Sequence, residues 1–215
     1  MRPDLVLYRV VRAILFAFSK VFFRLSVVGA ENLPTDRPFV LAPVHRSNID
    51  FLLVSALTTR RMRYMGKDSL WKAKPLGWFI SSLGAFPVHR GSADREALRL
   101  CIDIVNAGEP LVIFPEGTRQ TGPIVKEFFE GASYIASRTN VPIVPVGIGG
   151  SERAMPKGSK LIRPAKITIV VGEPIEPPPA KESGRPSRKA IQELTSRLHG
   201  EVQHLFDAAQ ARAGR

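Results

Sequence analysis

The sequence predicts an α/β fold with a mostly parallel central sheet flanked by helices, preceded by an amphipathic N-terminal helix. Short apolar segments of strand-like composition alternate with helical segments along the chain, which is typical of this class. Of the 215 residues, 44% are hydrophobic, which is enough for one sizeable core. Polar clusters directly follow three predicted strands, and the carboxyl ends of parallel strands gather at one edge of a sheet. A functional site is therefore expected at that edge.

The first element, residues 4–28, reads DLVLYRVVRAILFAFSKVFFRLSVV. A helix that crossed a membrane here would place Arg12 and Lys20 in hydrocarbon, at about 2.5–3.5 kcal/mol each. On a helix of about 100° per residue the cations instead share an arc of roughly 120°, and apolar side chains cover the rest. We therefore expect a helix that lies in the membrane interface with its cations among the headgroups. These cations are Arg2, Arg9, Arg12, Lys20 and Arg24.

The alternative for this segment is a core helix whose basic face is solvated. A signal peptide is disfavoured, because the charges continue through the apolar region and no small-residue cleavage site follows it. We expect a peripheral, monotopic protein on the cytoplasmic side of the cell membrane. The predicted division is a membrane-associating helical segment at 1–28 and an α/β domain at 29–215.

The remaining elements alternate between strand and helix. After a β-like segment at 24–34, strands are predicted at 39–44, 62–67, 85–88, 110–117, 141–150 and 166–175. Helices are predicted at 48–57, 69–84, 92–108, 126–140 and 188–210. Pro75 should break the second of these helices. Ser47 or Asn48 should cap the first.

The first polar cluster is HRSNID, residues 45–50. Two groups five residues apart on a regular helix point about 140° from each other, so His45 and Asp50 meet only if the chain turns between them. A capped helix start at Ser47 or Asn48 would supply that turn. Asp50 would then accept from Nδ1–H of His45 and leave Nε2 free to take a proton from a hydroxyl group. The alternative is an ordinary capped surface turn.

The other clusters add cations to the same edge. In VIFPEGTR, residues 112–119, Gly117 permits a tight turn and Arg119 suits a phosphate or a carboxylate. Glu116 and Arg119 could instead form an ion pair that stabilises the turn. Arg90 and Lys67 follow two further predicted strands. Three cations at successive strand ends suggest one pocket for an anion.

Composition narrows the chemistry further. The single cysteine, Cys101, excludes a disulfide within the chain, and the four histidines form no ligand-like cluster, so no metal site is expected. The net charge of +12 points to an anionic partner such as nucleic acid, an anionic membrane surface or a phosphorylated substrate. Known nucleic-acid-binding motifs are absent, so no nucleic-acid partner is expected.

Four blocks occur in an order that identifies a family resemblance: HRSNID (45–50), GAFPVHR (84–90), FPEGTR (114–119) and VPIVPV (141–146). The sequence resembles the bacterial lysophosphatidic acid acyltransferases (1-acylglycerol-3-phosphate acyltransferases) of the glycerolipid acyltransferase superfamily, over about residues 25–175. The resemblance implies transfer of a fatty acyl chain from acyl-CoA or acyl carrier protein to lysophosphatidic acid, giving phosphatidic acid. The thioester donor is already activated, which fits the absence of a GxSxG nucleophile motif. No cofactor other than this co-substrate is expected.

The resemblance also implies roles for individual residues. His45 would be the general base, and Asp50 would orient its imidazole. The EGTR block would place the glycerol part of the acceptor, and three cations would bind its phosphate. These substrate-binding residues are Lys67, Arg90, Glu116, Gly117, Thr118 and Arg119.

One position departs from the family pattern. Family members often read F-K-x-G after the EGTR block, whereas the stretch here is EFFEGA, residues 127–132, with Phe129 at the lysine position. The departure leaves open the same chemistry on glycerol 3-phosphate or another lysophospholipid. A noncatalytic, basic membrane-binding module is the remaining alternative, and it would not depend on His45.

Overall fold

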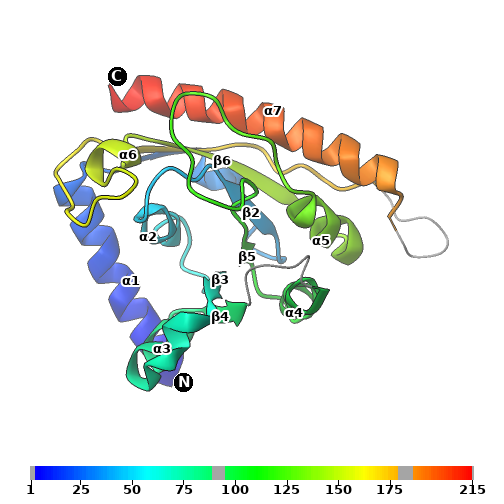
Figure 1. The fold of residues 1–215 in the computed structure, drawn as a ribbon, viewed down its shortest axis with the longest axis horizontal. Coiled ribbons are helices and arrows are strands. Elements are labelled where there is room, and N and C mark those ends of the chain that lie inside the picture. The colour runs from blue at the N-terminus through cyan, green and yellow to red at the C-terminus, as the bar shows by residue number, and fades with distance from the viewer. Residues whose placement is uncertain (1–2, 89–94, 179–185, 215) are drawn as a thin grey trace.

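The computed structural model describes residues 3–88, 95–178 and 186–214. Its centre is a seven-stranded sheet in the order β1-β7-β6-β2-β5-β3-β4 (Figure 1). All neighbouring strands are parallel except β6 and β7, which are antiparallel. The strands are β1 (Ser26–Val28), β2 (Val40–Pro43), β3 (Arg63–Lys67), β4 (Ala85–Val88), β5 (Leu111–Val112), β6 (Ile143–Gly149) and β7 (Thr168–Val171). The predicted α/β class with a mostly parallel sheet is confirmed.

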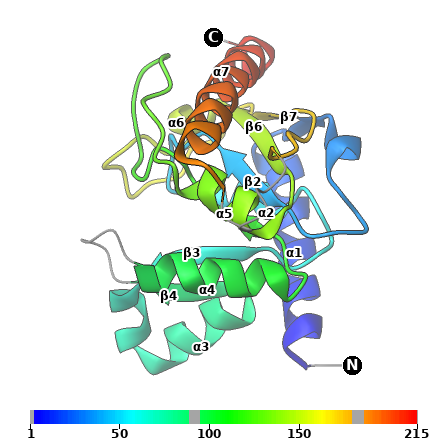
Figure 2. The ribbon, with the colours of Figure 1, turned by 90° about the vertical axis from the view of Figure 1, so that its right-hand side faces the viewer.

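The helices cover the two faces of the sheet. They are α1 (Pro3–Phe22), α2 (Asp50–Ser55), α3 (Lys74–Ser82), α4 (Arg95–Asn106), α5 (Gly131–Thr139), α6 (Ser151–Ala154) and α7 (Arg188–Ala213), with 3-10 turns η1 (Ala30–Asn32) and η2 (Asp68–Lys72). On one side α1 contacts α2 and α3, and on the other α5 contacts α4 and α7. Figure 1 shows α3 and α4 on opposite sides of β3 and β4, and in the turned view of Figure 2 α4 lies in front of these strands. The middle of the sheet is therefore closed on both faces, and β2 and β6 are buried along their whole length.

Helix α7 lies very close to β6. A Cβ atom added at Gly147 would lie 2.2 Å from the backbone carbonyl of Leu205, and one at Gly149 would lie 2.4 Å from that of Ala209. Glycine at both positions therefore lets the helix backbone approach the strand. This packing fixes α7 over the sheet, where it reaches the site described below.

Several predicted boundaries were wrong. The helix predicted at 126–140 begins only at Gly131, because the backbone N–H groups of Lys126 and Phe129 donate instead to Glu116 and Pro115. The segment 69–84 forms two helical pieces as predicted, η2 and α3, but the break lies at Ala73. Pro75 is in the first turn of α3, where its missing N–H is not needed. The closing helix continues to Ala213. β1, at the end of the segment 1–28, pairs with β7, so this segment also contributes a strand to the sheet.

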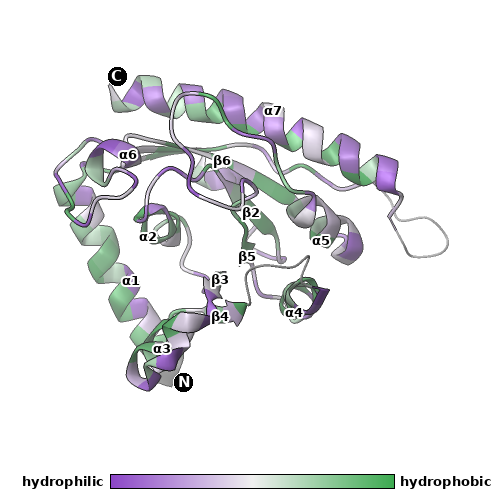
Figure 3. Ribbon diagram, in the orientation of Figure 1, coloured by the Kyte–Doolittle hydropathy of each residue, from purple (hydrophilic) through white to green (hydrophobic). Residues whose placement is uncertain are grey.

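One face of α1 packs on the protein, and the opposite face is exposed. Tyr8 is 3% exposed and donates its hydroxyl to Arg60 O. Arg12, expected among lipid headgroups, instead donates to Thr58 O at 2.5 Å and Ala56 O at 3.2 Å. These carbonyls follow the end of α2, where a cation is favourable. The exposed face carries the apolar side chains Val6, Val10, Ile14 and Val21, with Arg9 and Lys20 also exposed, and green accordingly alternates with purple along α1 in Figure 3. Among the described residues, no helix is long and apolar enough to cross a membrane.

Candidate active site

His45 and Asp50 lie together at the carboxyl end of β2. Nδ1 of His45 is 2.9 Å from Oδ2 of Asp50. The His45 side chain is 19% exposed and that of Asp50 is fully buried. The imidazole also stacks on the Phe114 ring, with centroids 4.1 Å apart. Because Nδ1 is engaged with Asp50, Nε2 is the ring nitrogen left for a reacting group.

The turn between these two residues has a different origin from the predicted one. Neither Ser47 nor Asn48 caps α2: its N-cap position is Ile49, with no side-chain cap. Instead, Oδ2 of Asp50 accepts the backbone N–H groups of Arg46 and Ser47, both at 2.7 Å. The carboxylate thus folds the preceding chain back over the helix start, which brings the His45 ring within reach. These two amides are therefore unavailable as hydrogen-bond donors to an oxyanion.

Glu116 is buried at 3% exposure, and it pairs with Arg46 rather than with Arg119. Nη1 of Arg46 lies 2.8 Å from both carboxylate oxygens. Oε2 also accepts from the His45 backbone N–H at 2.9 Å, and Oε1 from that of Lys126 at 3.1 Å. The carboxylate predicted to place the acceptor is therefore engaged entirely within the protein.

Residues 119–126, which we call the strap, cross from the EGTR turn toward α7. Gln203 of α7 accepts from Val125 N at 2.8 Å and donates to Pro123 O at 3.1 Å. Nε2 of His199 is 3.1 Å from Val125 O, which adds a further contact between the strap and α7. At its other end the strap is tied to the site, since Gln120 N donates to His45 O at 2.9 Å.

The remaining predicted site residues are placed as follows. Lys67 is exposed at the end of β3, and Arg119 is half-buried after β5. Because β3 and β5 are parallel neighbours, both cations lie at the sheet edge that carries His45. Gly117 has a φ of 69°, as the tight turn requires, and the exposed Thr118 accepts from Gln120 Nε2. Arg90 lies outside the described residues.

Phe129, at the position of the family lysine, is 70% exposed. Its ring lies over the turn: a Cβ atom added at Gly117 would come within 2.6 Å of it. Its backbone N–H donates to Pro115 O at 2.9 Å, which fixes the residue beside the turn. An aromatic surface therefore stands where the family pattern has a cation.

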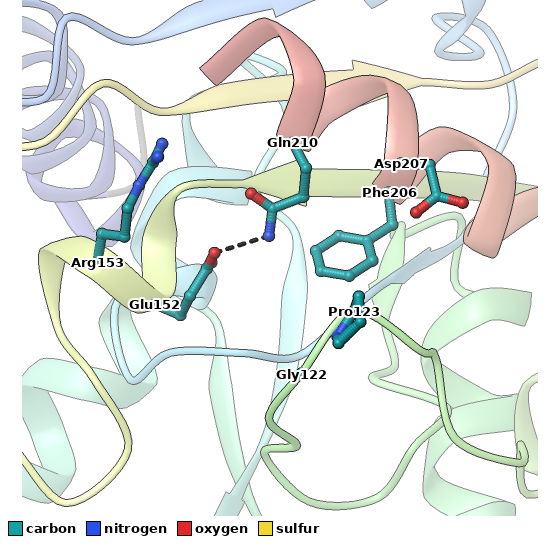
Figure 4. Close-up of a pocket in the computed structure, with 7 residues that line it drawn as sticks. All are labelled: Gly122, Pro123, Glu152, Arg153, Phe206, Asp207 and Gln210. Atoms are coloured by element: carbon teal, nitrogen blue, oxygen red, sulfur yellow. Dashed lines mark hydrogen bonds between the residues drawn. The ribbon is translucent and has the colours of Figure 1, made fainter. Parts of the chain in front are cut away.

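A cavity of about 280 Å³ lies beside the strap (Figure 4). It is lined by Gly122, Pro123, Glu152, Arg153, Phe206, Asp207 and Gln210. Within it Gln210 Nε2 donates to Glu152 Oε1 at 2.7 Å, as the dashed line in Figure 4 marks. The Phe206 ring also faces the Arg46 guanidinium at 4.8 Å, so this cavity and the His45 site share one wall.

Sequence reasoning missed Arg46, Phe114 and the part played by α7. Arg46 lies inside the HRSNID block. An arginine in a turn is nevertheless expected to be a surface cation unless a buried carboxylate partner is known. In the described part of the chain no group of three or more His, Cys, Asp or Glu side chains could hold a metal ion.

Comparisons with known proteins identify a family for this chain. Residues 24–149 match a family model described as "Acyltransferase". A 1-acyl-sn-glycerol-3-phosphate acyltransferase of Bacillus subtilis is 29% identical over 84% of this chain and 87% of its own length. One from Chlamydomonas reinhardtii is 31% identical over 86% of this chain and 56% of its own length. The crystal structure of a 1-acyl-sn-glycerophosphate acyltransferase, PlsC, from Thermotoga maritima matches with a TM-score of 0.74 and 28% identity, over 95% of this chain and 83% of that one.

The coverage of the plant and algal relatives is lower. The chain spans about half the length of those from Brassica napus, Chlamydomonas reinhardtii and Arabidopsis thaliana, at 46%, 56% and 44%. The matched family region contains His45, Asp50 and the EGTR turn, whereas α7 and its contacts to the strap lie beyond it.

Proposed function

The chain belongs to the acyltransferase family, and from this we propose that it transfers a fatty acyl chain from a thioester to the free hydroxyl of 1-acylglycerol 3-phosphate, giving phosphatidic acid. The donor is acyl-CoA or acyl carrier protein. The observation that carries the proposal is the His45–Asp50 pair, 2.9 Å apart at the sheet edge, with Nε2 of His45 left for the acceptor. The names of the relatives supply the acceptor class.

The reaction needs one base and no enzyme nucleophile. His45 Nε2 takes the proton of the acceptor hydroxyl while that oxygen attacks the thioester carbonyl. The tetrahedral intermediate then collapses, the carbon–sulfur bond breaks, and the leaving thiolate takes up the proton held on His45 Nε2, which regenerates the neutral base. Asp50 holds the Nδ1–H tautomer and stabilises the imidazolium that forms. Lys67, Arg90 and Arg119 are proposed to bind the acceptor phosphate, as cations at adjacent strand ends can.

Because of Phe129, a different acceptor remains an alternative. An exposed aromatic ring over Gly117 removes a cation from the place where the family pattern has one. The same chemistry on glycerol 3-phosphate or another lysophospholipid would need a different set of phosphate contacts, so the acceptor must be measured.

We further propose that the protein associates peripherally with an anionic membrane through α1. In this proposal residues 1–28, which contain α1, are the membrane-associating segment, and residues 29–215 are the acyltransferase domain. The exposed apolar face of α1 includes Val21, which is 82% exposed. Helix α3 contacts α1 and exposes 67% of Trp78, an aromatic side chain suited to a membrane interface. The chain's net charge of +12 favours anionic lipids. A lipid acceptor would then reach the site from the bilayer.

The test is acyl transfer in lipid vesicles from palmitoyl-CoA and from palmitoyl-acyl carrier protein, with lysophosphatidic acid, glycerol 3-phosphate and lysophosphatidylglycerol offered in parallel. His45→Ala should lower the rate by about 10²–10⁴-fold, whereas His204→Ala, on the exposed side of α7, should not. Transfer only to glycerol 3-phosphate would show that glycerol 3-phosphate is the acceptor and would leave the proposed mechanism unchanged. Absence of His45-dependent transfer to all three acceptors would favour the noncatalytic module.

A further inference from the structure

The buried pair Arg46–Glu116 is an unusual component of this site. Arg46 is 1% exposed and the Glu116 side chain is fully buried. Such a pair seldom stabilises a fold more than two apolar residues would, because both charges must leave water. The role of this pair therefore depends on the groups to which its two side chains are hydrogen-bonded.

The buried pair holds the His45 main chain on both sides. Oε2 of Glu116 accepts from His45 N at 2.9 Å, and Nη1 of Arg46 donates to His45 O at 3.1 Å. The Arg46 backbone N–H also reaches Asp50, the partner of the imidazole. The base is thus bonded to both side chains of the pair, and its orienting acid is bonded to the Arg46 main chain.

The buried pair is itself anchored by distant segments. Nη2 of Arg46 donates to Ile124 O at 3.3 Å, and Lys126 N donates to Glu116 Oε1. The guanidinium lies against the Phe206 ring of α7 at 4.8 Å. The His45 main chain is therefore fixed to the strap and, through it, to the last helix.

Glu116 has little capacity left for a substrate. A carboxylate offers about four acceptor positions. Here Oε1 receives Arg46 Nη1 and Lys126 N, and Oε2 receives Arg46 Nη1 and His45 N. A glycerol hydroxyl would have to displace one of these donors.

We propose that Arg46 and Glu116 are positioning residues: they fix the His45 main chain, and thereby the direction of Nε2, and Glu116 does not bind the acceptor. The proposal rests on the proposed function in one respect, that His45 is the base. Since a misplacement of about 1 Å can lower a rate about 10²-fold, loss of the buried pair should affect the chemical step rather than acceptor binding.

The first experiment separates kcat from the acceptor KM. Glu116→Gln and Arg46→Gln should each lower kcat about 10- to 100-fold and change the KM for lysophosphatidic acid less than about threefold. Glu109→Gln is the matched control, because Glu109 forms a half-buried ion pair with Arg63 away from the site. If Glu116→Gln instead raises KM more than about tenfold and leaves kcat unchanged, Glu116 binds the acceptor and the proposal fails.

The double variant Arg46→Gln/Glu116→Gln separates positioning from simple stabilisation. Each single change leaves one buried charge unpaired, so each should lower Tm more than the double change does. A structural role predicts that kcat recovers with Tm. Positioning predicts that kcat stays low in the double variant, about as low as in either single variant, because nothing then holds the His45 main chain.

A readout independent of activity completes the test. The long-range ¹H–¹⁵N spectrum of the histidine rings, assigned with His45→Ala, shows whether Nδ1 of His45 keeps its proton toward Asp50. The His45 signals should shift in all three variants and stay fixed in Glu109→Gln. Unchanged His45 signals would overturn the proposal. If the wild-type protein acylates none of the acceptors, the proposed function fails, and the spectra alone still decide whether the buried pair positions His45.

Discussion

Asp50 Oδ2 lies 2.9 Å from His45 Nδ1, although five positions separate the two residues. The same oxygen accepts from the backbone of Arg46 and Ser47, so one carboxylate both builds the turn and orients the ring. Helix formation alone would have pointed the two side chains apart.

This double role predicts the behaviour of Asp50→Asn. An asparagine oxygen in the place of Oδ2 can still accept the same N–H groups, but the neutral amide cannot stabilise the imidazolium that forms when His45 takes the proton. We expect kcat to fall about 10²–10⁴-fold with a small change in Tm. Steady-state kinetics and thermal unfolding measure the two. Asp103→Asn, on the exposed side of α4, is the control, and an equal loss there would argue against a specific role.

The close approach of α7 to β6 predicts opposite effects of two alanines. Gly147→Ala should lower the free energy of unfolding by about 1–3 kcal/mol or more, because its Cβ would meet the backbone of Leu205 at 2.2 Å. Gly200→Ala, with nothing within 4 Å of its Cβ, should raise it by about 0.5–1 kcal/mol. Denaturant unfolding checks both values. A tolerated Gly147→Ala would mean that the helix can withdraw from the strand.

The strap should loosen when its anchor on α7 is removed. Gln203→Leu removes the hydrogen bonds to Val125 N and Pro123 O. We expect faster cleavage of the strap in limited proteolysis, located by mass spectrometry of the fragments. Gln192→Leu, exposed on the same helix, should leave the rate unchanged. Equal cleavage in both variants would show that the strap is held by other contacts.

Membrane association should depend on the exposed face of α1. The pair of changes Ile14→Glu and Val21→Glu places charge on side chains that are 63% and 82% exposed. Because these positions make few contacts with the protein, folding should be retained. Binding to phosphatidylglycerol-containing vesicles should weaken at least about tenfold in co-sedimentation. Leu100→Glu, 38% exposed on α4, is the matched control.

Cys101 should be unreactive in the folded protein. Burial raises the pKa of its thiol from 9.0 to about 12, and the thiolate is the reactive form. At pH 8.5, iodoacetamide should label the native thiol on the order of 10²–10³-fold more slowly than the urea-unfolded one. The raised pKa also means that the stability linked to this thiol is intact below about pH 9 and is lost as pH rises toward 12. Rapid native labelling would contradict the burial.

The sequence predicted the order of the strands and longer helices and the cluster of polar residues at the end of β2, but not the short helix α6. Both predictions follow from local signals: apolar segments of strand length, helical periodicity, and polar residues directly after strands. β4 was predicted with its observed bounds. The meeting of His45 and Asp50 was also predicted, although the cause given, a Ser47 or Asn48 cap, was wrong.

What could not be predicted depends on contacts between distant segments. Arg46 and Glu116 are 70 residues apart. No local sequence pattern predicts that an arginine in one turn will be buried against a glutamate in another. The inward turn of Arg12 has the same reason, since its carbonyl partners lie 44 and 46 residues away. The roles of Lys67 and Arg119 stay predictions.

The position of β1 has a consequence for how the protein is made. Ser26 pairs with Thr168, and Asn32 donates to Val171 O, 139 residues further along the chain. During synthesis the apolar α1 and the edge strand β1 therefore leave the ribosome long before their sheet partner exists. Pairings of such large sequence separation close slowly, and an unpaired strand beside an apolar helix is prone to aggregation meanwhile. Early adsorption of α1 to a bilayer would shelter this end of the chain until β7 arrives, so refolding yield without lipid should fall as protein concentration rises.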